Sequence, residues 1–342
     1  MIQLLACTPG FEPIRHEDRY SAWVEFHPDL DDAVLDAAAW GLDLNLAMQK
    51  GEHDLDRFTS TCALAAEHEV GLKVWPLLPE EDGYWPNQGN APAFAAWTRE
   101  LVAVAAEDCQ TLDGVVIDME MPIERAEELE QLVAEGADEL AVASFLVETI
   151  DEEGFATAKE DYRALVDELR EQGLRTHLTT LPMLADDLHD GDETLALALW
   201  TPVMDVGWDI VSVQVYRSFF QTTLASALED PEQQFTAGLV TSYADDMFEH
   251  FGDRAGLDLG TTGAVGIGVH DGLSTEELQE DLAAATAFVA ADHVAIYSLE
   301  GLDEHADPGA AVRHPAANAV EPDPATLEIR ELFATLDALR DD

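Results

Sequence analysis

The stretch DGVVIDMEMP, residues 113–122, combines a run of β-branched residues with two carboxylates just before a proline. Side chains on a strand alternate between its two faces, so residues two apart point the same way. Val116, Asp118 and Glu120 therefore share one face of the expected strand. Two neighbouring carboxylates at a strand end repel each other and are costly to bury. The pair therefore predicts a site that shifts a proton-transfer pKa or holds a metal, with a solvated strand end as the alternative.

Strand-like apolar runs recur along the whole chain, with acid-rich helical segments between them. The runs span residues 2–6, 42–48, 72–78, 114–120, 175–181, 210–216, 264–270 and 294–299, with 22–26 as a rival for the first. Regular alternation of strands and helices is typical of a parallel sheet with right-handed crossovers. Eight such units predict a closed (β/α)8 barrel, the TIM barrel. The sequence has no Gly-rich phosphate loop after the first strand, which counts against a dinucleotide-binding fold.

Helix signals support this architecture. Helices are expected over 54–69, 92–107 and 274–290, and the last opens with the capping box Ser274-Thr-Glu-Glu277. We expect one barrel domain over residues 1–342.

Two helical additions to this barrel are expected. The long segment 123–173 between the fourth and fifth strands predicts a helical insertion that overhangs the barrel mouth. A C-terminal helix is expected over 326–342, after a Pro- and Ala-rich linker.

The charge balance is extreme, with 71 Asp plus Glu against 16 Lys plus Arg and a formal net charge of −55. Such a surface repels nucleic acid and anionic membranes, which excludes both as natural partners. The acids are spread between apolar positions along the chain, which is typical of a folded protein in molar salt, where charges are screened within about 3 Å. We therefore expect a halophile protein, with solvent cations over its acidic surface. We expect it in the cytoplasm, or secreted if an export signal has been removed.

The cysteines and the hydropathy pattern exclude other classes. Cys7, Cys62 and Cys109 are odd in number and lack a CxxC spacing, so neither a disulfide framework nor a zinc site is expected. No segment reaches the roughly 18 apolar residues that a membrane span needs. No cofactor is expected.

Catalytic groups of a (β/α)8 barrel lie at the C-terminal ends of its strands. On the sixth strand Ser212, Gln214 and Tyr216 share a face opposite three valines, so we expect the polar set to point into the barrel. An ordinary barrel interior is filled with Val, Ile and Leu, which makes this polar layer informative. Further residues expected at the substrate site are Asn45, Trp75, Trp85, His177, Tyr297 and Glu300.

Residues 113–120 resemble the fourth-strand signature of glycoside hydrolase family 18, the chitinases and endo-N-acetylglucosaminidases. That signature reads Asp-Gly-apolar-Asp-apolar-Asp-x-Glu, and this chain carries Val116 where the signature has an Asp. The segment Gln214-Val-Tyr216 is similar to the family's sixth-strand polar-x-Tyr element. Tyr297 stands where the family usually keeps a tryptophan beneath the sugar.

The resemblance implies a retaining glycosidase for N-acetylhexosamine linkages. Glu120 would be the general acid that protonates the glycosidic oxygen, and the substrate's own acetamido oxygen would attack the anomeric carbon. Asp118 would orient the acetamido N–H, and Tyr216 and Gln214 would hydrogen-bond the acetamido oxygen. Tyr297 would stack beneath the sugar.

Two other functions fit parts of the pattern. A barrel could bind Mg or Mn through Glu120, Asp118 and His177, with His270 or Glu300, and isomerise or cleave a sugar. A non-catalytic barrel could bind carbohydrate in its cleft without hydrolysing it. The replacement of a motif Asp by Val116 favours this binding function.

Overall fold

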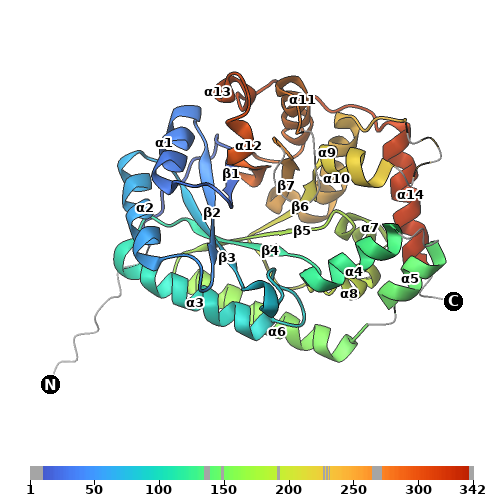
Figure 1. Ribbon diagram of the computed structural model, residues 1–342, viewed down its shortest axis with the longest axis horizontal. Helices are drawn as coiled ribbons and strands as arrows, with labels where there is room; N and C mark the ends of the chain where they lie inside the picture. The colour runs from blue at the N-terminus through green and yellow to red at the C-terminus, as the bar shows by residue number, and fades with distance from the viewer. Residues whose placement is uncertain are drawn as a thin grey trace.

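The computed structural model describes residues 11–134, 139–147, 150–190, 193–225, 228, 230, 232–263 and 272–338. Eight parallel strands pair in chain order, and the last pairs with the first, so that the sheet closes into a barrel ringed by helices (Figure 1). The strands are β1 (Ser21–Val24), β2 (Asp43–Gln49), β3 (Leu72–Leu77), β4 (Gly114–Met119), β5 (Arg175–Thr180), β6 (Ile210–Val215), β7 (Ala255–Gly260) and β8 (Val294–Tyr297). The predicted (β/α)8 barrel is confirmed.

Two strands differ from the sequence prediction. β1 lies in the rival segment 22–26, while the first predicted run, 2–6, lies outside the described residues. β7 covers Ala255–Gly260, so the prediction of 264–270 as the seventh strand was wrong, and that run also lies outside the described residues. β7 reads Ala-Gly-Leu-Asp-Leu-Gly. Its two glycines and its aspartate interrupt the apolar pattern, so the sequence gives only a weak strand signal here.

The helices follow the strands as expected. They are α1 (Leu30–Trp40), α2 (Leu55–Glu67), α3 (Ala91–Asp108), α4 (Ile123–Ala134), α5 (Glu139–Val147), α6 (Glu152–Glu171), α7 (Leu184–Asp190), α8 (Thr194–Ala198), α9 (Arg217–Phe219), α10 (Ala237–Phe251), α11 (Thr275–Ala285), α12 (Leu299–Leu302), α13 (Pro308–Ala311) and α14 (Pro324–Ala338). The capping box of α11 is confirmed. Among the described helices, none is long and apolar enough to cross a membrane.

The enlarged insertion after β4 consists of α4, α5 and α6. α4 and α5 lie on the same side of the barrel as α14 (Figure 1). Ile123, the first residue of α4, packs against the aromatic cluster inside the barrel that contains Trp75 and Trp85. The insertion therefore begins at the C-terminal end of the barrel, where β4 ends.

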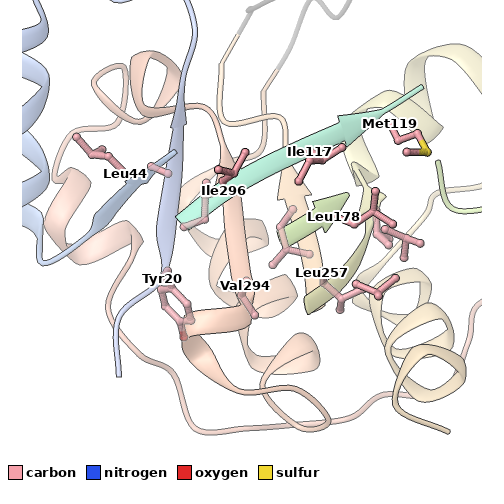
Figure 2. Close-up of a cluster of buried hydrophobic side chains, with 14 of the residues drawn as sticks. Tyr20, Leu44, Ile117, Met119, Leu178, Leu257, Val294 and Ile296 are labelled. Atoms are coloured by element: carbon pink, nitrogen blue, oxygen red, sulfur yellow. The ribbon is translucent and has the colours of Figure 1, made fainter. Parts of the chain in front are cut away.

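The alternation of side chains on β4 is as predicted. Ile117 and Met119 point outward into the large core between the barrel and its helices, where Figure 2 shows them with Leu178 and Leu257. Val116 points inward and packs with the aromatic cluster. Each large apolar side chain buried in this way stabilises the fold by about 1.5–3 kcal/mol.

A disulfide joins Cys62 of α2 to Cys109, which directly follows α3, with a Cα–Cα distance of 5.5 Å. The expectation that the cysteines form no such bond was therefore wrong. The two residues are 47 positions apart, a separation that carries no local signal. Only the packing of α2 against α3 brings them together.

Ion pairs close the N-terminal end of the barrel. Asp113 accepts a hydrogen bond from Arg15 and a second one, 2.6 Å long, from Arg175. Arg175 also bonds Asp292 at 3.2 Å. The nearby Lys73 points into the barrel, and its burial lowers its pKa. Paired basic and acidic side chains therefore lie at the end opposite to the carboxylates of β4.

Candidate active site at the barrel mouth

The two carboxylates of β4 meet a single amide donor. Gln214 of β6 donates from Nε2 to Asp118 Oδ1 and to Glu120 Oε1, each at 2.7 Å. Asp118 is almost fully buried, and Glu120, directly after the last residue of β4, is partly exposed. The structure thus brings Asp118, Glu120 and Gln214 together at the barrel mouth.

The environment of this pair favours a bound proton. Burial raises the pKa of Glu120 to about 7, although hydrogen bonds with Gln214 and Asp118 act in the opposite direction. Burial also raises the pKa of Asp118 well above its ordinary value, and the negative charges of Glu120 and Asp258 add to this effect. Two neighbouring carboxylates in a buried site share a proton more easily than they ionise together. The pair can therefore hold a proton near neutral pH.

A further carboxylate, Glu25, stands at the end of β1. Glu25 follows the last residue of that strand and accepts hydrogen bonds from two phenols, the Tyr84 hydroxyl at 2.7 Å and the Tyr297 hydroxyl at 2.5 Å. Burial raises the pKa of Glu25, the two hydroxyls lower it, and the charge of Glu300 raises it further. This half-buried carboxylate lies at the same end of the barrel as the β4 pair, because Glu25 follows β1 as Glu120 follows β4, and its charge also raises the pKa of Glu120.

Two predicted tyrosines form one wall of the mouth. The rings of Tyr216 and Tyr297 stack with centroids 5.6 Å apart and an interplanar angle of 26°. One face of Tyr297 is therefore covered by Tyr216, and its hydroxyl is held by Glu25. Glu300 Oε1 accepts the backbone N–H groups of Glu25 and Phe26, both at 3.0 Å, so Glu300 fixes the chain that follows β1.

Asp258 is a further buried carboxylate of the barrel interior, near the pair. Asp258 of β7 accepts a hydrogen bond from the Thr179 hydroxyl and another, at 3.3 Å, from the indole of Trp23. It pairs in register with Gln214, while Thr179 pairs with Asp118. Burial raises the pKa of Asp258 to about 7. Asp258 and Thr179 therefore form a hydrogen-bonded polar group in register with Gln214 and Asp118.

The other predicted site residues lie deeper or form the walls. His177 pairs in register with Val116, one interior layer below Asp118, and bonds Ser212 Oγ at 2.6 Å. Burial holds the pKa of His177 well below its ordinary value, so the ring is neutral. Asn45 donates to Ser21 Oγ at 3.2 Å inside the barrel.

The predicted tryptophans are mostly covered. Trp75 is 2% exposed and packs edge-on against Trp23, with ring centroids 4.6 Å apart. Trp85 is 8% exposed and lies edge-on to Tyr84 at 5.1 Å. These two rings therefore expose little surface on which a sugar could stack.

Glu25 and Asp258 are the site residues that the sequence prediction missed. Both belong to strands that were assigned elsewhere. Placing the first strand at 22–26 would have put Glu25 among its last residues. Asp258 gives a weaker signal, because glycines surround it.

The described residues contain no group of three or more His, Cys, Asp or Glu side chains placed to hold a metal ion. Of the ligands proposed for a metal-dependent barrel, His177 is bonded to Ser212 and Glu300 to the backbone after β1. His270 lies outside the described residues.

Comparisons with known proteins give a fold and no family. No protein-family model matches the chain, and no curated protein matches it in sequence. Among solved structures, a family 1 β-glucosidase from Thermotoga maritima matches with a TM-score of 0.51 and 10% identity over 97% of this chain and 99% of that one. A β-mannanase from Streptomyces thermolilacinus matches with a TM-score of 0.45 and 13% identity over 82% and 79%. A D-psicose 3-epimerase from Clostridium cellulolyticum H10 matches with a TM-score of 0.42 and 16% identity, over 94% of this chain and 96% of that one. The likeness to the β-glucosidase agrees with the (β/α)8 barrel fold that the structure shows.

Proposed function

We propose that this protein is a glycoside hydrolase that cleaves N-acetylhexosamine linkages with Glu120 as the general acid. The observation that carries the proposal is the buried pair of Asp118 and Glu120, joined by Gln214 at the C-terminal end of the barrel. A carboxyl group whose pKa is about 7 is suited to donate a proton near neutral pH. The resemblance of β4 to family 18 glycosidases supports the same role.

The proposed reaction proceeds in two steps. Glu120 gives its proton to the glycosidic oxygen as the bond from that oxygen to C1 breaks, and the substrate's acetamido oxygen bonds C1 from the opposite face. Asp118 accepts a hydrogen bond from the acetamido N–H and offsets the charge of the oxazolinium ion. Water then attacks C1, and Glu120 takes a proton from that water, so that the product keeps the original anomeric configuration.

The surrounding residues would position the sugar. Gln214 keeps the two carboxylates together, and Tyr216 offers its hydroxyl to the acetamido oxygen. The wall of Tyr216 and Tyr297 would present aromatic surface to the sugar ring.

The test is hydrolysis of chromogenic mono-, di- and tri-N-acetylglucosaminides in about 2–3 M KCl, where the surface charge is screened. Turnover that Glu120→Gln abolishes, with an unchanged circular dichroism spectrum, supports the proposal. A folded protein that hydrolyses none of these substrates contradicts it. Stoichiometric Mg or Mn after dialysis, together with sugar isomerisation, would indicate the metal-dependent alternative.

A further inference from the structure

We propose that Glu25 is a second catalytic carboxylate of this mouth, which lets the protein also hydrolyse glycosides whose sugar carries no acetamido group. The inference rests on the proposed role of Glu120 as the acid. It adds a base that the substrate-assisted route does not use.

The position of Glu25 is the first argument. It follows β1 directly, at the end of the barrel where catalytic groups lie. β1 and β4 are three strands apart in a ring of eight, so Glu25 and Glu120 rise from different sides of the mouth. Glu300 holds the backbone N–H groups of Glu25 and Phe26 at 3.0 Å and so fixes where the side chain begins.

The hydrogen bonds of Glu25 are the second argument. One oxygen accepts the Tyr84 hydroxyl at 2.7 Å, and the other accepts the Tyr297 hydroxyl at 2.5 Å. Both phenols have pKa values raised by burial, so they stay neutral and act only as donors. Donors on both oxygens favour the carboxylate form and fix its rotamer, while each oxygen keeps a lone pair for water.

The different surroundings of the two carboxylates are the third argument. Glu120 bonds an amide and a carboxyl group, whereas Glu25 bonds two phenols. Among the described residues the two glutamates share no hydrogen-bond partner. Carboxylates in contrasting environments at one mouth can divide the acid and base roles between them. An inverting mechanism requires a water molecule between the base, here Glu25, and the anomeric carbon.

The chemistry then needs no group from the substrate. Glu25 accepts a proton from water as the water oxygen bonds C1, and Glu120 protonates the leaving oxygen as its bond to C1 breaks. The products are a free sugar of inverted configuration and an alcohol, with Glu25 protonated and Glu120 ionised. A proton returned from Glu25 through solvent to Glu120 restores the starting state.

The test compares para-nitrophenyl glycosides of glucose, mannose and galactose, in both anomers, with the corresponding N-acetylglucosaminides. The variants are Glu25→Gln and the matched control Glu52→Gln, which changes an exposed acid just after β2. Both are checked for an unchanged thermal melt. We expect Glu25→Gln to slow hydrolysis of at least one plain glycoside by roughly 100-fold or more, and of the acetamido substrate by less than about tenfold. Glu52→Gln should change neither.

Two further readouts exclude a merely structural role. Proton NMR of the first product should show inversion for the plain glycoside. Azide added to Glu25→Ala should restore release of nitrophenol and form a glycosyl azide, because the small anion replaces the attacking water. Retention of configuration, or failure of azide to rescue, overturns the role of Glu25 as a base.

The proposal and the proposed function can fail separately. Hydrolysis of acetamido sugars alone, or an equal loss on both substrates in Glu25→Gln, overturns the role of Glu25 and leaves that of Glu120 intact. Turnover of plain glycosides alone, lost in both Glu25→Gln and Glu120→Gln, supports Glu25 and overturns the substrate-assisted route. No turnover of any glycoside overturns both.

Discussion

Nε2 of Gln214 lies 2.7 Å from Oε1 of Glu120, which joins the C-terminal end of β6 to the residue that follows β4. An uncharged amide in this place gives hydrogen bonds to the carboxylates without adding a charge to the mouth. The same nitrogen reaches Asp118, so one side chain sets the distance between the two acids.

Replacing Gln214 should therefore change both the positions of Asp118 and Glu120 and the pKa of Glu120. The hydrogen bond from Gln214 lowers the pKa of Glu120, so Gln214→Leu should raise that pKa above about 7. The acid form then persists to higher pH, and the alkaline limb of kcat/KM should move up while the maximal rate falls by roughly 100-fold. Gln279→Leu, which removes a donor to the Ala310 carbonyl far from the mouth, serves as control. An unmoved alkaline limb would contradict this account of the pair.

Asp258 should make stability depend on pH. Its pKa of about 7 in the folded protein is above the ordinary 3.8, so folding favours its protonated form. That contribution is present below about pH 4 and is lost as the pH rises to 7. Asp258→Asn cannot ionise, so it should be more stable than the wild type at pH 8, by up to about 4 kcal/mol, and gain less at pH 5. Urea unfolding at both pH values in the same salt measures this, and an equal difference at both would contradict it.

The Cys62–Cys109 disulfide should stabilise the fold. Breaking a bond that closes a loop of this size lowers the free energy of unfolding by about 2–4 kcal/mol. Cys62→Ala and Cys109→Ala should each have this effect, and the double variant should lose little more, because all three lack the same bond. Chemical denaturation with and without a thiol reductant provides the control. If the reductant leaves wild-type stability unchanged, the bond is not formed in solution.

The net charge of −55 should make folding depend on salt. Acid side chains repel one another over about 10 Å at 0.1 M salt and over only about 3 Å at 1 M. The melting temperature should therefore rise steeply between 0.1 M and 2 M KCl, as followed by circular dichroism. A melting temperature that does not change with KCl would argue against adaptation to high salt.

The strands with bulky β-branched residues could be predicted from the sequence, and so could the faces on which their acids lie. The alternation in β4 places Asp118 inside, and that in β6 places Gln214 inside, as the structure has them. The sequence could not show that these two side chains meet, since their strands are separated by β5.

There is a physical reason why the sequence prediction missed Glu25 and Asp258. β1 has only four residues and was recognised only as a rival for the first strand, and β7 carries two glycines that interrupt its apolar run. Their stability comes from pairing with both neighbours in the closed barrel. Glu25 and Asp258, which these two strands supply, became visible only with the tertiary structure.

The most direct test of Glu120 as the acid varies the leaving group. Rates are measured for N-acetylglucosaminides of a poor leaving group, such as unsubstituted phenol, and of dinitrophenol, which departs without a proton. The account predicts that Glu120→Gln slows the first substrate by roughly 100- to 10,000-fold and the second far less. An equal loss on both substrates would contradict the role of Glu120 as the proton donor.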